Sequence, residues 1–259
     1  MSEYKLGYNI EAEDHDFLDS LIEPETILKS AKAAHPDHNP YAPSYTWIED
    51  QKSIGSCQGC ALALCFQIAL VQRFGVQARF SKMGAYIWSQ QEDNLAGRDQ
   101  GSTLSGGMKA AKKGLCLENV YEYPNPVRYS SSVPSSANGQ RVFKMLGSRK
   151  ITDVDLIWEL LRSGVCVQFG VSWGSSCEQP VCNTYKGGRG GHSCVLTSLE
   201  EGTDHAIMTN SWGTKWGQHG RVKWTKNFVS EILRKDRYPS FVCHDPQGLE
   251  APEGFIDRV

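Results

Sequence analysis

The sequence predicts an α+β fold with two lobes, one mainly helical and one built on antiparallel strands. Residues 57–74 form an apolar stretch that contains no proline and is followed by Gly75, which is typical of a buried helix. After a serine-rich segment at residues 129–140, short β-type runs alternate with glycine-rich turns. The helical and the sheet-forming patterns therefore occupy separate halves of the chain.

Further elements are predicted from the spacing of apolar residues and from turn residues. In the first half, helices are expected around residues 82–91 and 104–113. In the second half, we expect a helix over residues 151–161 and strands over residues 164–173, 192–199, 205–212 and 220–225.

The domain organisation follows from changes in composition. Residues 1–45 are polar, acidic and interrupted by prolines, and they hold too little apolar sequence for a core of their own. They are predicted to be an N-terminal extension with one short helix within residues 19–34. Residues 46–259 are predicted to form one two-lobed domain, with lobes at about residues 46–135 and 136–259.

Charge and hydropathy exclude several classes of partner. The 259 residues include 27 basic and 29 acidic side chains, and the net charge of −2 favours neither a nucleic acid nor an anionic membrane as partner. The longest nearly apolar stretch, residues 60–71, is shorter than the roughly 20 residues that span a bilayer, so no transmembrane helix is expected. The acidic N-terminus lacks the pattern of a secretory signal, which predicts synthesis in the cytoplasm.

The nine cysteines are an odd number, so at least one thiol is expected to be free in the monomer. Cys57 and Cys60 form a CxxC motif, and Cys177 and Cys182 lie five positions apart. A zinc site would require a second closely spaced pair together with histidines at ligand spacing, and the sequence contains no such set. We therefore predict no metal site.

Cys57 is the candidate nucleophile because it stands where a polar, glycine-containing turn meets the predicted helix. The unpaired N–H groups and the dipole of a helix N-terminus favour the thiolate, which is the reactive form of cysteine. A small buried hydrophobic residue is the structural alternative. The turn at Gly55 and Ser56 is expected to bring the Gln51 amide beside the thiol, so that this amide and the Cys57 N–H form an oxyanion hole.

His192 and Asn210 supply the two other groups that a reactive thiol requires. His192 starts a β-type run behind two glycines, and Asn210 follows eighteen residues later. The imidazole is expected to act as general base, and the amide is expected to hold its tautomer and orientation. Trp212 is interpreted either as a cover for the His–Asn hydrogen bond or as a core aromatic. His205 is a competing base, which we interpret as a turn residue.

With these groups in the order Cys, His, Asn, the sequence resembles the papain-type cysteine peptidases. The motifs that carry the resemblance are Gln51, Gly55, Ser56 and Cys57 in register, His192 before a β-type run, and NSWG at residues 210–213 with Trp216 and Gly217. Residues 101–124 also resemble the family segment between the substrate cleft and a Tyr-Pro turn. The resemblance implies a papain-like two-lobed fold, with a helical left lobe, a right lobe of antiparallel β-sheet or barrel, and the active site in the cleft between them.

For the activity, the resemblance implies an endopeptidase that acts on a peptide or protein substrate through an acyl-enzyme thioester, without a metal or an organic cofactor. Cys57 is the implied nucleophile, His192 the acid and base, Asn210 the residue that orients it, and Gln51 an oxyanion donor. The implied substrate-binding residues are Gly101, Ser102, Gly190, Gly191 and Trp212.

Two positions depart from the family pattern. Gln58 follows the nucleophile in place of the usual tryptophan, and Ile54 replaces a cysteine that often precedes the nucleophile by three positions. The usual disulfide near the active site therefore has no partner, which fits an enzyme that folds in a reducing compartment. The final location stays open between the cytoplasm, a viral particle and export by a dedicated system, and a role within a larger assembly stays open too.

Two other classes of function stay open from the sequence. A thiol–disulfide oxidoreductase using Cys57 and Cys60 would also place its first cysteine at a helix N-terminus, but it leaves His192 and Asn210 without a role. The other class is a catalytically silent papain fold that serves as a structural or binding subunit. The N-terminal extension is expected to be either a latch that fills the cleft or a strap that supports the fold, and the strap is favoured.

Overall fold

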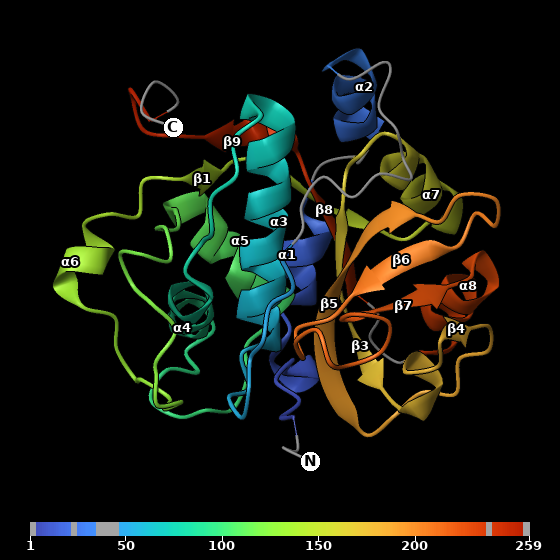
Figure 1. Cartoon of the computed structure of the whole chain (residues 1–259), viewed down its shortest axis with the longest axis horizontal. Helices are drawn as coiled ribbons and strands as arrows, with labels where there is room; N and C mark the ends of the chain where they lie inside the picture. The colour runs from blue at the N-terminus through green and yellow to red at the C-terminus, as the bar shows by residue number, and fades with distance from the viewer. Residues whose placement is uncertain (1–3, 22–24, 35–46, 237–239, 256–259) are drawn as a thin grey trace.

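The computed structural model describes residues 4–21, 25–34, 47–236 and 240–255, and it divides them between a helical lobe and a sheet lobe (Figure 1). The helical lobe, on the left of the view, contains α3 (Cys57–Phe74), α4 (Lys82–Glu92), α5 (Leu104–Lys113) and α6 (Ser135–Asn138). The short strands β1 (Lys144–Met145) and β9 (Leu249–Glu250) pair within the same lobe. This separation of helices from sheet confirms the predicted α+β fold class.

The second lobe is built on a seven-stranded sheet with the strand order β2-β8-β3-β5-β6-β7-β4. Neighbouring strands are antiparallel except for the parallel pair β4–β7. The strands are β2 (Ser148–Ile151), β3 (Val167–Trp173), β4 (Val181–Cys182), β5 (Gly190–Leu199), β6 (Ala206–Thr209), β7 (Arg221–Trp224) and β8 (Ser240–His244). The helices of this lobe are α7 (Val154–Arg162), α8 (Lys226–Lys235) and the 3₁₀ turn η2 (Ser175–Cys177), whereas the 3₁₀ turn η3 (Pro246–Gly248) contacts α3 and β1.

Helix α3 is buried on both sides, as its all-round apolar sequence predicts. Leu62 and Phe66 pack into the core of the helical lobe, whereas Leu64 and Ile68 pack with Val195 of β5. The helix is long and apolar enough to cross a membrane by composition, but 78% of it is buried inside the protein, which is the behaviour of a core helix. Its first residue is thereby placed at the junction of the two lobes.

The N-terminal residues follow the surface of both lobes rather than forming a separate core. They contain η1 (Ile10–Ala12), α1 (His15–Asp19) and α2 (Glu25–Ala34). Leu18 of α1 is buried with Leu104 of α5, and Ile27 of α2 is buried in the core of the sheet lobe. The short helix predicted within residues 19–34 corresponds to α2, whereas α1, which begins after the N-cap Asp14, was not predicted.

Two further features differ from the sequence-based expectations. Helix α8 and strand β8 were not predicted, although both are fully integrated into the sheet lobe. The core of the helical lobe also continues past residue 135, because Phe143, Met145 and Leu249 all pack into it. The polypeptide therefore crosses between the lobes after Met145 and returns at its C-terminal end.

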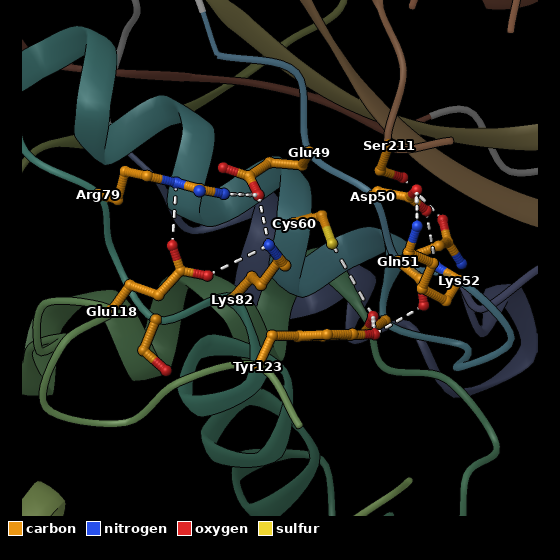
Figure 2. Close-up of polar contacts among 12 residues, drawn as sticks. Glu49, Asp50, Gln51, Lys52, Cys60, Arg79, Lys82, Glu118, Tyr123 and Ser211 are labelled. Atoms are coloured by element: carbon orange, nitrogen blue, oxygen red, sulfur yellow. Dashed lines mark hydrogen bonds and ion pairs between the residues drawn. The ribbon is translucent and has the colours of Figure 1, made fainter. Parts of the chain in front are cut away.

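A buried cluster of ion pairs fixes the segment that precedes α3 (Figure 2). Glu49 is 2% exposed and pairs with Lys82 Nζ at 2.7 Å and with Arg79 Nη2 at 3.0 Å. Glu118 pairs with the same two cations, at 3.3 and 2.9 Å. Burial on its own would raise the pKa of Glu49, but Lys82 and Arg79 lower it, so the carboxylate is charged. This cluster ties residue 49 to α4.

Removing the buried cation of this cluster is expected to destabilise the fold. Lys82→Met leaves the Glu49 carboxylate buried with only partial compensation, and we expect a loss of about 3–5 kcal/mol in the free energy of unfolding. Lys32→Met removes an exposed partner of Glu159 and should cost less than about 1 kcal/mol. Chemical denaturation of both variants measures the difference, and equal losses would contradict a special role for the buried pair.

Candidate active site

Cys57 is the first residue of α3 and is fully buried. The backbone N–H groups of Ser193, Gly7 and Gln58 lie near its sulfur and lower the pKa of the thiol. Ser193 directly follows His192, so the sulfur lies next to the strand that carries the imidazole. The helix start therefore presents the thiol to β5, as the sequence motifs predict.

His192 lies on β5 and pairs with Asn210, which follows β6. His192 Nε2 lies 2.8 Å from Asn210 Oδ1, while His192 Nδ1 is buried without a hydrogen-bond partner among the described residues. The backbone N–H of Ser211 also donates to Asn210 Oδ1, at 2.8 Å, and thereby fixes the amide. The ring of Trp212 packs on the imidazole at a centroid distance of 4.7 Å, which agrees with its predicted covering position.

Gln51 is held so that its amide nitrogen points between the lobes. Its Oε1 accepts hydrogen bonds from Ser211 Oγ at 2.7 Å and Trp212 Nε1 at 3.2 Å, and Figure 2 shows Ser211 beside it. These two donors fix the orientation of the amide group. Its nitrogen, Nε2, donates to the carbonyl oxygens of Lys5 at 2.7 Å and Ile54 at 2.9 Å. The Gln51 side chain is thus available to hold a carbonyl oxygen.

A segment of the same chain lies across this site, and we call residues 4–9 the cleft segment. The Tyr8 N–H donates to the Gly191 carbonyl of the sheet lobe at 3.1 Å. On the opposite wall, the Ser102 N–H donates to the Gly7 carbonyl and the Asn9 N–H donates to the Ser102 carbonyl, both at 3.0 Å. The backbone of the cleft segment therefore pairs with both lobes at once.

The side chains of the cleft segment complete these contacts. Tyr4 stacks on Trp212 at a centroid distance of 5.1 Å and an interplanar angle of 10°, and its hydroxyl donates to the Trp212 carbonyl at 2.7 Å. Leu6 fills the space where a side chain on Gly190 would project. All five predicted substrate-binding residues, Gly101, Ser102, Gly190, Gly191 and Trp212, lie against this segment.

Close backbone approach explains why glycines line this path. A Cβ on Gly7 would overlap the Gly55 carbonyl, and a Cβ on Gly101 would overlap the Gly7 carbonyl. Gly101 also has a φ of 84°, which other residues rarely adopt. The fit between the cleft segment and its walls therefore depends on the missing side chains.

Gln58, where the family usually has tryptophan, connects the start of α3 to the cleft wall. Its Oε1 accepts a hydrogen bond from Ser102 Oγ at 3.0 Å, and both side chains are fully buried. Gln168 Nε2 of β3 lies 3.4 Å from the Gln58 carbonyl and 3.3 Å from Ser193 Oγ. Sequence reasoning recognised the substitution but not this contact, since Ser102 lies far from Gln58 along the chain.

Burial by the cleft segment keeps the thiol and the imidazole neutral. Burial raises the pKa of Cys57 to about 11, although the neighbouring backbone N–H groups lower it. Burial lowers the pKa of His192 to about 4, although the hydrogen bond to Asn210 raises it. With the segment in place, neither group carries a charge at neutral pH.

The competing candidates lie in different surroundings. His205 stands in the turn before β6, with Nδ1 3.4 Å from Glu200 Oε2. Cys60 is buried one turn further along α3, where burial raises its pKa and its sulfur lies 3.8 Å from Ser56 Oγ. No group of three or more His, Cys, Asp or Glu side chains suited to a metal ion occurs within the described residues.

Several solved structures share this architecture. A cysteine protease from Xylella fastidiosa, xylellain, superposes with a TM-score of 0.72 over 94% of this chain and 97% of its own, at 19% identity. The proform of the ragweed cysteine protease Amb a 11 gives a TM-score of 0.61 over 78% of this chain and 63% of its own, at 16% identity. Procathepsin L 3 of Tenebrio molitor gives 0.60 over 77% and 66%, also at 16% identity.

Among curated proteins, an uncharacterized peptidase C1-like protein of Acanthamoeba polyphaga mimivirus is 26% identical over 205 residues. This match covers 70% of the present chain and 65% of the length of that relative. No family model matches the chain. Together these comparisons confirm the papain-like fold and the resemblance to papain-like cysteine peptidases that the motifs predict.

Displacing the cleft segment is expected to expose Cys57. In the full chain, Gly7→Ala introduces a Cβ that overlaps the Gly55 carbonyl, so residues 4–9 should leave the site. We expect iodoacetamide to alkylate Cys57 about tenfold faster. This factor corresponds to a shift of about 1.4 kcal/mol in the opening equilibrium towards the form in which the segment has left the site. Gly139→Ala is the matched control, because a Cβ there meets no atom closer than 3.7 Å. An unchanged alkylation rate in Gly7→Ala would show that the segment does not protect the thiol.

Proposed function

We propose that this chain is a cysteine endopeptidase whose active site is covered by its own cleft segment. Cys57 attacks the peptide carbonyl and forms an acyl-enzyme thioester, and Gln51 Nε2 with the Cys57 N–H stabilises the oxyanion. His192 protonates the leaving amine and then activates water, while Asn210 orients its ring. The substrate is a peptide or protein, and the reaction requires no metal or organic cofactor.

One observation carries this proposal: the site already holds a peptide backbone in a binding arrangement. Both walls pair with the cleft segment, and Gln51 donates to a peptide carbonyl, that of Lys5. The partnerless Nδ1 of His192 is the ring atom available for proton exchange with the thiol. A thiol–disulfide oxidoreductase would leave the Gln51 and His192 contacts without a role.

The cleft segment contacts the oxyanion donor and the nucleophile through different peptide groups. Gln51 Nε2 donates to the Lys5 carbonyl, whereas the Gly7 N–H lowers the pKa of the Cys57 thiol. The segment supports the latch alternative for residues 4–9, and the buried Leu18 and Ile27 support the strap alternative for the residues that follow.

Side-chain replacement in the opened Gly7→Ala form tests the catalytic assignments. Cys57→Ala and His192→Ala should abolish hydrolysis of a fluorogenic peptide, and Gln51→Ala should lower kcat by about 100-fold. Cys60→Ser and His205→Ala should retain most of the activity, which also separates the peptidase from a redox enzyme and from a silent fold. Loss of activity in His205→Ala with full activity in His192→Ala would refute the assignment of the base.

The pH dependence of thiol reactivity should change when the cleft segment leaves. With a pKa of about 11 for Cys57, roughly one molecule in ten thousand carries the thiolate at pH 7. Alkylation of the unaltered chain should therefore rise about tenfold per pH unit up to about pH 11. In Gly7→Ala, water reaches both groups and the thiolate–imidazolium pair can form, so the rate should level off at a lower pH. Rate profiles of the same shape would show that Cys57 reacts only after transient opening.

A further inference from the structure

The Tyr8 side chain of the cleft segment is enclosed by both lobes, and we call the space that it fills the Tyr8 pocket. Tyr8 is 4% exposed, although it belongs to a segment that lies across the junction of the two lobes. Its ring lies against Gly170 of β3, where a Cβ would overlap the ring carbons. The same apolar cluster contains Leu104, Met108 and Val242, and it includes Cys57. The pocket is therefore shaped for an aromatic ring directly beside the candidate nucleophile.

The floor of this pocket is polar. The Tyr8 hydroxyl donates to Glu13 Oε2 at 3.0 Å and lies 3.3 Å from Ser240 Oγ. The two Glu13 oxygens accept the N–H groups of Leu104 at 2.9 Å and Ser105 at 2.8 Å, at the start of α5. Burial and the neighbouring Glu13 raise the pKa of Tyr8 well above its usual value, so the phenol keeps its proton and remains a donor. The floor thus offers a fixed carboxylate acceptor.

Glu13 is attached to the protein body by contacts that do not involve the cleft segment. The Asp14 N–H donates to Ser105 Oγ at 3.2 Å, and the Asp14 carboxylate pairs with Lys109 Nζ at 2.7 Å. Leu18 is fully buried four residues later. By contrast, the hydrogen bonds between the backbone of residues 7–9 and other backbone groups go to the cleft walls at Ser102 and Gly191. Residues 4–9 can therefore leave while Glu13 stays at the floor of the pocket.

We propose that Glu13 is a specificity-determining residue that selects a tyrosine side chain in the pocket vacated by Tyr8. This inference rests on the proposed peptidase function. A tyrosine fills the space beside Gly170 and donates its hydroxyl to Glu13, whereas a phenylalanine leaves Glu13 and Ser240 without that donor. A leucine lacks both the ring and the donor. The favoured substrates are therefore peptides with a tyrosine at the residue that pairs with Ser102 and Gly191.

The test uses the full chain opened by Gly7→Ala and further changed by Tyr8→Ala, so that the pocket is empty. Peptidyl epoxides that differ only in one side chain, tyrosine, phenylalanine or leucine, are compared for their rate of Cys57 modification by mass spectrometry. Two series of reagents are used, with the variable residue at the first or at the second position from the epoxide. We expect the tyrosine reagent to react about tenfold faster than the phenylalanine reagent.

Variants of the pocket floor identify the cause of that preference. Glu13→Ala should bring the tyrosine rate down to the phenylalanine rate, because no acceptor for the phenol remains, whereas Glu13→Gln keeps one acceptor oxygen and should retain part of the preference. Glu11→Ala, which removes an exposed carboxylate from the same stretch, should keep the tenfold preference. The inference is overturned if the tyrosine and phenylalanine reagents modify Cys57 at equal rates before Glu13 is changed. It is also overturned if the preference for the tyrosine reagent survives in Glu13→Ala.

Hydrolysis of matching fluorogenic peptides separates this inference from the proposed function. Selective modification of Cys57 without hydrolysis would refute the peptidase activity and support the pocket assignment. Hydrolysis without preference for tyrosine would refute the role of Glu13 and leave the peptidase in place. If no reagent modifies Cys57 in the opened form, the pocket is not accessible beside the nucleophile, and the inference is wrong.

Discussion

The burial of α3 between the two lobes is the constraint on which the site depends. An α-helix that is apolar around its whole circumference must be covered on all sides, and here α4 and α5 cover one side while the sheet covers another. The helix can begin only where this cover ends, so Cys57 stands at the junction of the lobes with the free N–H groups of a helix start around its sulfur. The Glu49 cluster then fixes the segment that brings Gln51 to the same point.

The same geometry explains why a peptide backbone occupies the site. The Ser102 wall of the helical lobe and the Gly191 wall of the sheet lobe both expose backbone donors and acceptors, and an extended chain between them satisfies both. Excluding water from Cys57 and His192 at the same time removes the stabilisation of their charged forms. In the proposed peptidase, occupation of the cleft therefore also keeps the thiol and the imidazole in their neutral forms.

The sequence predicted the elements that carry strong periodic signals and the residues that carry chemistry. The helix at Cys57–Phe74 was predicted from composition alone, and His192 and Asn210 were paired from their order in the chain. Helix α8 and strand β8 were not predicted, although the N-cap Thr225 and the spacing of the buried Phe228, Val229 and Ile232 are local signals of a helix. The roles of Tyr8 and Glu13 could not be predicted, since they depend on contacts with Gly170, Ser240 and the start of α5 that no local pattern encodes.

The N-terminal extension joins two properties that its composition does not reveal. Its first described part binds through backbone groups and the side chains of Tyr4, Leu6 and Tyr8, whereas Leu18 of α1 and Ile27 of α2 are buried in the cores of the protein. Contacts of the first kind can be exchanged for those of another peptide, because any extended chain offers the same backbone groups. Contacts of the second kind belong to the cores and are lost only when the fold is lost. A boundary between residues 9 and 13 therefore separates an exchangeable ligand of the site from a permanent part of its wall.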